Sequence, residues 1–147
     1  MANFAYNLAK SKLLKGAIDL DSGGDDVRAI LVMTNTTADT EDDKEFISGF
    51  TTLDEMDGAG YARVALTGES VGDDAANDRA EFDGTDITFS GVSAGTRSVQ
   101  AMVIYKHVTN DADSIPIAFI DTGGFPFAPG GGDITVTWNA EGILQLA

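Results

Sequence analysis

Short apolar runs, separated by Gly, Asp and Asn, recur along most of the chain. Runs of this length that are rich in Val, Ile, Thr and aromatic residues are typical of β-strands, and the polar residues between them are typical of turns. Eight segments fit this description: Val27–Thr34, Tyr61–Leu66, Arg79–Phe82, Asp86–Ser90, Ser98–His107, Ile115–Asp121, Asp133–Trp138 and Ile143–Leu146. They predict a mainly β, single-domain fold, either a β-sandwich or a jelly-roll-like barrel of about eight short antiparallel strands.

The apolar positions inside these segments separate one-sided from two-sided strands. In the run "DITVTWN", Ile134, Val136 and Trp138 alternate with polar residues, which indicates one buried and one solvated face. The runs "AILVM" (Ala29–Met33) and "AMVIY" (Ala101–Tyr105) are apolar at every position. These two runs therefore predict central strands covered on both faces, and the alternation predicts that Trp138 belongs to the core.

Three polar stretches predict how neighbouring strands connect. "FDGTDI" (Phe82–Ile87) contains an Asp-Gly pair and predicts a hairpin, and "WNAEGI" (Trp138–Ile143) predicts another. The stretch "HVTNDADS", which begins with His107, has the composition of an exposed connection. His107, the only histidine of the chain, is therefore expected at the end of one strand of a hairpin.

The N-terminal segment predicts a short helix ahead of the β body. Asn3 is a suitable N-cap, and Gly16 is a suitable C-terminal stop. One face of this helix is apolar at helical spacing and consists of Phe4, Ala5, Leu8, Ala9 and Leu13. The sequence therefore predicts one domain over residues 1–147, with a helix or arm at 1–16 and a β body at 27–147. A further helical turn is expected around Phe46 and Ile47.

Charge excludes some classes of partner. The chain of 147 residues has a net charge of −15 and contains no cysteine. So acidic a surface repels nucleic acid and anionic membranes, and neither is expected as a partner. Without cysteine there is neither a disulfide nor a thiolate metal site. No apolar stretch approaches the ~20 residues that span a bilayer.

The positive charge is concentrated before the first acid, Asp19. A basic segment on an acidic body is suited to an acidic neighbour, either another protein or a sister subunit. The candidate contact residues combine this charge with an apolar face: Phe4, Leu8, Lys10, Lys12 and Lys15. Two alternatives stay open, because the apolar face is equally suited to the protein's own sheet and the lysines to a solvated helix face.

Three stretches imitate sites of chemistry. "GVSAG" (Gly91–Gly95) has the spacing of a nucleophile elbow, but that motif needs a helix after it, and a strand is predicted here. His107 has no second histidine for a metal site and lies in a polar turn. "DLDSGGDD" (Asp19–Asp26) begins like a calcium loop but has Ile30 where the bidentate glutamate belongs. No catalytic, cofactor-binding or metal-ligating residue is predicted, and an enzyme is not expected. A looser cation site at this loop or at "GDDAAND" (Gly72–Asp78) stays open.

The order of segments is similar to that of a known class of proteins. The segments "GYARVALTG", "AMVIYK" and the C-terminal "GGDITVTWNAEGILQLA" carry the similarity, which extends over nearly the whole chain. The chain resembles a family of small tailed-bacteriophage virion structural proteins, the head decoration or cement type. These segments are strand and turn signatures, so the resemblance concerns fold and assembly. The loop "LVMTNTTADT" is less typical.

The resemblance implies a virion component that is assembled in the host cytoplasm and located on the phage head. Its partner would be the major capsid protein, and decoration proteins of this kind are often homotrimers. A tail, fibre or baseplate component that contacts the host is an alternative. Another is a carbohydrate-binding β-sandwich, in which Tyr61, Trp138 and Phe125 stack on sugar rings. No cofactor is implied.

Overall fold

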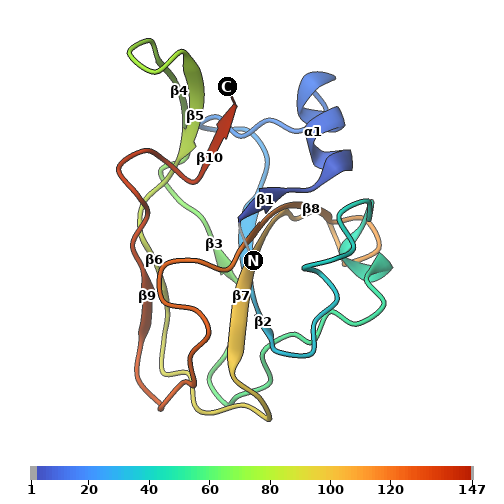
Figure 1. The fold of residues 1–147 in the computed structure, drawn as a ribbon, viewed down its shortest axis with the longest axis vertical. Coiled ribbons are helices and arrows are strands. Elements are labelled where there is room, and N and C mark those ends of the chain that lie inside the picture. Colours follow the sequence, from blue (N-terminus) through green and yellow to red (C-terminus); the bar gives the residue numbers. More distant parts are fainter. Residues whose placement is uncertain (1–2, 147) are drawn as a thin grey trace.

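Ten antiparallel β-strands and one α-helix form the part of the chain that the structure, a computed structural model, describes: residues 3–146 (Figure 1). Five strands form the main sheet, in the spatial order β1-β8-β7-β2-β3. Their bounds are Phe4–Ala5 for β1, Ile115–Ile120 for β8, Val99–Lys106 for β7, Val27–Met33 for β2 and Val64–Ala65 for β3. Each neighbouring pair is antiparallel.

Two smaller sheets complete the fold. One has the order β10-β5-β4, and the other pairs β6 with β9. Their bounds are Leu144–Leu146 for β10, Arg79–Asp83 for β5, Ser70–Asp74 for β4, Ile87–Phe89 for β6 and Ile134–Val136 for β9. The mainly β prediction with a short N-terminal helix is confirmed. Within residues 3–146 the sheets stay open and close into no barrel.

Strands β2, β7 and β8 are buried on both faces, as the apolar runs predict. All but one residue of β2 and all but two of β7 are buried, and in β8 only Ile120 is half-buried. The side chains of Phe119 and Tyr105 have no exposed surface. Because successive residues of a strand point to opposite faces, these strands need cover on both sides. The rest of the chain supplies it.

Part of this cover comes from the N-terminal segment and from a loop in the first half of the chain. Tyr6 lies just before α1 (Asn7–Leu14) and Ala9 lies on it, and both are fully buried. Ile47 of the 3₁₀ helix η1 (Ile47–Gly49) is buried as well. The ring of Tyr6 lies 5.6 Å from that of Phe50, centroid to centroid. The helical turn expected around Ile47 is confirmed, in 3₁₀ form.

The start of α1 differs from the prediction, and its end agrees. Residues 4 and 5 form strand β1 against β8, and the helix begins after Tyr6, which has no capping side-chain bond. Asn3 is no N-cap; its side chain accepts a bond from the Asp121 N–H at 3.0 Å. At the other end, Gly16 has φ 66°, and the N–H of Ala17 bonds the carbonyl of Lys12 at 2.8 Å. This is the glycine-terminated end that the sequence predicts.

The two predicted hairpins at Phe82–Ile87 and Trp138–Ile143 are wrong. Strand β5 pairs with β10, and β6 pairs with β9, so the segments form one interrupted antiparallel ribbon. Residues 83–86 on one side of the interruption face residues 137–143 on the other. The second side is longer, and its additional residues form a tight turn. In this turn Gly142 has φ 83° and lies so close to the Phe82 carbonyl that a Cβ would not fit. Turn residues thus mark the breaks between strands without telling which strands pair.

His107 follows the last residue of β7, and β7 pairs with β8 across the connection. The prediction that it marks the end of a hairpin strand is confirmed. Strands β1 and β4 were not predicted. The sequence of β4, "SVGDD", has little apolar character and so gave no strand signal. The strand is mostly exposed because it forms the outer edge of a small sheet.

We expect the N-terminal segment to be essential for folding. Replacing Tyr6 by Ala should destabilise the protein by about 3–5 kcal/mol, because a fully buried ring is lost. Tyr6→Phe should cost only about 1 kcal/mol, because it removes only the hydrogen bond from the hydroxyl to the Ala38 carbonyl. Urea unfolding measures both. A truncated chain that begins at Gly16 should aggregate, and a folded monomer would contradict this assignment.

The two predicted core aromatics should differ in their contribution to stability. Phe89 is 1% exposed, whereas Trp138 is half-buried and lies at the edge of the core, so its core assignment holds only in part. We expect Phe89→Ala to cost about 3–5 kcal/mol and Trp138→Ala distinctly less. Equal losses of unfolding free energy in urea titrations would show that the indole is as deeply packed as the phenyl ring.

Candidate interaction surface

The outward face of α1 carries an exposed leucine beside two lysines. Leu14 is 86% exposed, the highest value among the large apolar residues that stand exposed in the described chain. Lys10 precedes it by four positions, so the two side chains lie on the same side of the helix. Lys15 follows directly and is also exposed. Ala9 and Leu13 face the protein instead.

Lys10 and Lys15 differ from the other basic residues in forming no ion pair with a described acid, and the Lys10 ammonium donates one hydrogen bond, to the side chain of Asn7 at 3.2 Å. The chain contains nine lysines and arginines. All four arginines and three lysines form ion pairs within the protein, which makes seven: Arg28, Arg63, Arg79, Arg97, Lys12, Lys44 and Lys106. Over residues 3–146, only Lys10 and Lys15 form none. Their charge is therefore available to a partner.

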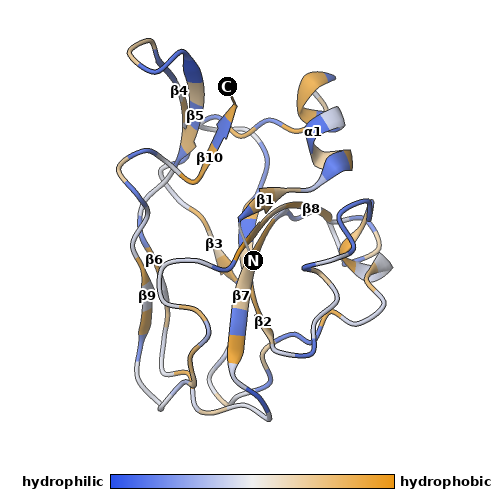
Figure 2. Cartoon of the chain, in the orientation of Figure 1, coloured by the Kyte–Doolittle hydropathy of each residue, from blue (hydrophilic) through white to orange (hydrophobic). Residues whose placement is uncertain are grey.

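An apolar cavity adjoins this face of the molecule. It has a volume of about 350 Å³ and lies between the N-terminal segment and the small sheet β10-β5-β4. Leu13, next to Leu14, forms part of its wall, and Val71 and Leu146 form another part. Both of the latter are 48% exposed. Figure 2 shows the apolar C-terminal turn of α1 beside the end of β10. We call Lys10, Leu14, Lys15, Val71 and Leu146 the α1 surface.

The structure divides the five predicted contact residues into two groups. Phe4 stacks on Phe119 with the ring centroids 5.4 Å apart, Leu8 is half-buried, and Lys12 pairs with Glu45 at 3.1 Å. These three contribute to the protein's own structure. Lys10 and Lys15 remain directed to solvent. The apolar face thus packs on the protein's own sheet, one of the two alternatives that the sequence left open.

Sequence reasoning missed Leu14, although a signal was present. In "KLLKG", two leucines are adjacent, and neighbouring helical residues point about 100° apart. Leu13 and Leu14 therefore point in different directions, and an eight-residue helix that packs on one side exposes one of them. Val71 and Leu146 gave no such signal, because they meet α1 only in the tertiary structure.

The imitations of a hydrolase site do not assemble into one. Gly91–Gly95 is followed by strand β7 where a nucleophile elbow has a helix. Ser93 precedes β7 and His107 follows it, and the backbone N–H groups of these residues bond to Ala59 and Asp26 respectively. The Nδ1 atom of His107 is buried without a hydrogen-bond partner, and its ring stands edge-on to Tyr105 at 6.2 Å.

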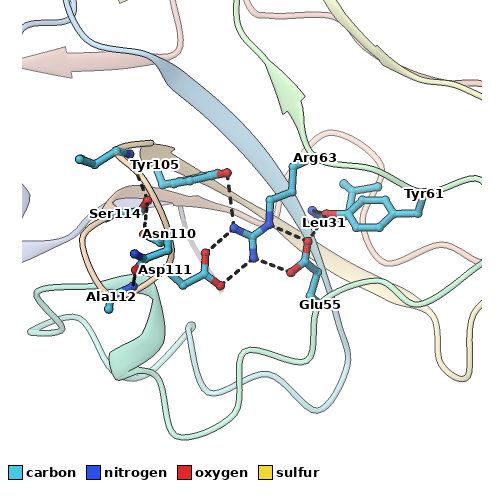
Figure 3. A network of polar contacts seen from close by, with 10 residues as sticks. Leu31, Glu55, Tyr61, Arg63, Tyr105, Asn110, Asp111, Ala112 and Ser114 are labelled. Carbon is cyan, nitrogen blue, oxygen red and sulfur yellow. Dashed lines mark hydrogen bonds and ion pairs between the residues drawn. The ribbon is translucent and has the colours of Figure 1, made fainter.

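A polar network beside His107 has a structural character. The guanidinium of Arg63 lies between Glu55 and Asp111, with bidentate bonds to each carboxylate at 2.5–2.9 Å (Figure 3). It also lies over the ring of Tyr105, 5.4 Å from the centroid. Glu55 accepts a further bond from the hydroxyl of Tyr61. The network thus joins the 51–63 segment, which leads into β3, with the β7–β8 turn.

These contacts shift the pKa values of their members. The hydrogen bonds with Arg63 hold the pKa of the Asp111 carboxyl below its ordinary value of 3.8. Hydrogen bonds to Glu55 and then to Asp111 raise the pKa of Arg63. Burial, reinforced by the charge of Glu55, raises the pKa of Tyr61. Arg63 and Asp111 are therefore held in their charged forms, which suits a structural clamp.

We expect the clamp to weaken in acid. Because the folded-state pKa of Asp111 is lowered, its contribution is complete above 3.8 and is lost as the pH falls through the folded-state pKa. Asp111→Asn should cost about 1–2 kcal/mol near pH 7, a value limited by partial exposure, and less near pH 3, which lies below the ordinary pKa of the carboxyl. Urea unfolding at both pH values measures this difference. Asp113→Asn, in the same turn but without a cationic partner, should show little change at either pH.

Two acidic regions were considered for cation binding. Carboxylates of Asp74, Glu81 and Glu141 converge closely enough to hold a metal ion. However, the guanidinium of Arg79 pairs with all three, and its positive charge lies where a metal ion would bind. In the loop Asp19–Asp26, Asp25 pairs with Lys106 at 2.8 Å, and other carboxylates accept backbone N–H bonds. Both regions thus use their carboxylates within the fold.

The three residues considered for sugar stacking are placed differently. Tyr61 stacks on Phe89 with centroids 6.0 Å apart, and its hydroxyl bonds Glu55. Trp138 and Phe125 line a groove between β9 and the main sheet. The structure thus separates Tyr61 from the other two.

Comparisons with known proteins provide no relative from which a function can be transferred. No family model, curated protein or solved structure matches the chain. Among the described residues, no helix is long and apolar enough to cross a membrane. What the protein does must therefore be inferred from its own surfaces.

Proposed function

We propose that the chain is a capsid decoration protein of a tailed bacteriophage and that it attaches to the major capsid protein shell through the α1 surface. The observation that supports this proposal is which basic residues form ion pairs within the protein and which do not. In a chain with 24 acidic and nine basic residues, the two basic residues that form no ion pair within residues 3–146 flank the most exposed leucine of that range. A surface with an apolar centre and a charged rim has the composition of a protein interface.

The charge distribution gives such an attachment a direction. A body of net charge −15 is repelled by an acidic shell at most orientations. The repulsion is weakest where Lys10 and Lys15 face the shell. Complementary charges of this kind steer association and fix orientation more than they add affinity. Leu14 supplies apolar area that is removed from water on contact, and Val71 and Leu146, at the cavity that Leu13 lines, supply more.

The same surface is suited to a sister subunit, because the other copies of the chain are also acidic. A homotrimer on the shell would place several α1 surfaces side by side. A tail, fibre or baseplate location is the alternative within the particle. The location in the particle distinguishes these possibilities, and cryo-electron microscopy of purified particles that contain the chain would establish it.

We expect the α1 surface to be required for attachment. The triple variant Lys10→Glu, Leu14→Ser, Lys15→Glu should bind particles that lack the chain at least about tenfold more weakly than the wild type. Attachment of the wild type should weaken as salt is added, because exposed charges are screened. Co-sedimentation of labelled protein with particles measures the affinity.

A matched control uses another exposed apolar residue. Val108 is 48% exposed in the β7–β8 turn, so Val108→Ser should bind particles as the wild type does. Circular dichroism should show that all variants are folded. If the triple variant bound at full affinity, the α1 surface would not be the point of attachment. If mass spectrometry of purified virions did not detect the chain, the decoration function itself would be excluded.

A further inference from the structure

An open groove of about 920 Å³ lies between the inner face of β9 and the main sheet. One wall is formed by the half-buried side chains of Ile134, Val136 and Trp138. These residues alternate along the chain with exposed threonines. The facing wall includes Ile120 at the end of β8 and Phe125 in the segment that follows it. In Figure 1 this segment, drawn in orange, runs between β8 and β9. The volume is at the upper end of the range for small-molecule sites.

The groove is almost free of charge, in contrast to the rest of the protein. Charged residues make up 22% of the chain, but of the 21 residues that line the groove only Asp133 is charged. Its Oδ1 atom accepts a hydrogen bond from the N–H of Gly91 at 2.8 Å. The lining therefore favours an uncharged ligand, since there is no basic group to hold an anion and the single acid is engaged.

Two aromatic residues give the groove flat apolar surfaces. The indole N–H of Trp138 donates to the carbonyl of Thr85 at 3.0 Å, and its backbone N–H bonds Asp86. These bonds fix the ring on the groove wall before any ligand arrives. Phe125 is half-buried and lies 5.6 Å from Phe127, centroid to centroid. Rigid aromatic rings provide contact area at a low cost in conformational entropy.

Polar groups occur among the apolar ones. The groove is also lined by Thr122 and Asn139, and by the backbone at Thr135 and Thr137, whose exposed side chains point to the opposite side of the strand, where Thr135 bonds Thr88. The hydroxyl of Thr122 bonds the side chain of Asn3. The Oδ1 atom of Asn139 accepts a bond from Glu141, whereas its NH₂ group has no bond within the described part of the chain. A ligand that matches this lining has both apolar faces and hydroxyl edges. A lipid chain lacks the hydroxyls, and a second copy of the chain would bring a net charge of −15.

We infer that the groove binds a neutral oligosaccharide, with pyranose rings stacked on Trp138 and Phe125. The C–H faces of a pyranose contact the aromatic rings, and its hydroxyls reach the side chains of Thr122 and Asn139. Because the groove is open along one side, a sugar chain longer than the groove can pass through it. For a virion protein, such a site would attach the particle to surface glycans.

Trp138 is the only tryptophan of the chain, so its fluorescence reports directly on the groove. The full chain should be titrated with cellohexaose, mannohexaose and N-acetylchitohexaose up to about 10 mM, which saturates a site with a millimolar dissociation constant. We expect a saturable change in intensity or emission wavelength with at least one of them. Phe125→Ala should weaken that binding about tenfold while keeping the tryptophan reporter.

The control is an aromatic residue of similar exposure elsewhere. Phe46 is half-buried beside η1 and does not line the groove, so Phe46→Ala should leave the affinity unchanged. Circular dichroism establishes that both variants are folded. No saturable response to any of the three sugars, or a response that Phe125→Ala leaves intact, would overturn the assignment. Fluorescence that changes with protein concentration in the absence of sugar would overturn it as well, since a second copy would then occupy the groove.

Discussion

Burial of both faces of β2, β7 and β8 is the constraint on which the rest of the structure depends. These strands satisfy their backbone hydrogen bonds within the sheet, but neither of their faces is suited to water. A single antiparallel sheet usually exposes one face. Here the chain must supply two covers. The N-terminal helix with the preceding Tyr6, the η1 loop and the ribbon that carries Phe89 provide them, and all contribute residues to one core.

Both proposed sites follow from the way in which these covers are built. The helix α1 has only eight residues and packs through one side, so the residues on its other side are left in solvent. The β6–β9 pair is narrow and does not reach across the main sheet, which leaves the apolar side of β9 half-buried along a groove. Covers made of short elements thus stabilise the sheet and still expose apolar surface. Surface of this kind is a common feature of binding sites.

The sequence predicts the elements better than their connections. Eight strands, the buried runs "AILVM" and "AMVIY" and the glycine that ends α1 follow from local patterns, because periodicity and turn chemistry act over a few residues. The pairing of β5 with β10 joins segments about 60 positions apart in the chain, and no local pattern encodes it. The clamp at Arg63 depends in the same way on Asp111, which is 48 positions away. For the candidate surface, Lys10 and Lys15 were predicted, whereas Val71 and Leu146 become neighbours of the helix only after folding.

The ion pairs show why an unpaired lysine is informative in this protein. Most of the paired cations fasten a loop or a helix to another part of the chain: Arg63 joins two segments, Arg97 holds Asp54, and Lys106 holds Asp25. With 24 acids available, a lysine that serves the fold finds a partner easily. Among the described residues, Lys10 and Lys15 have no acidic partner, although each adds a desolvation cost if its face is covered without compensation. A partner that covers α1 must therefore bring acidic groups of its own, and this requirement excludes most neutral or basic surfaces.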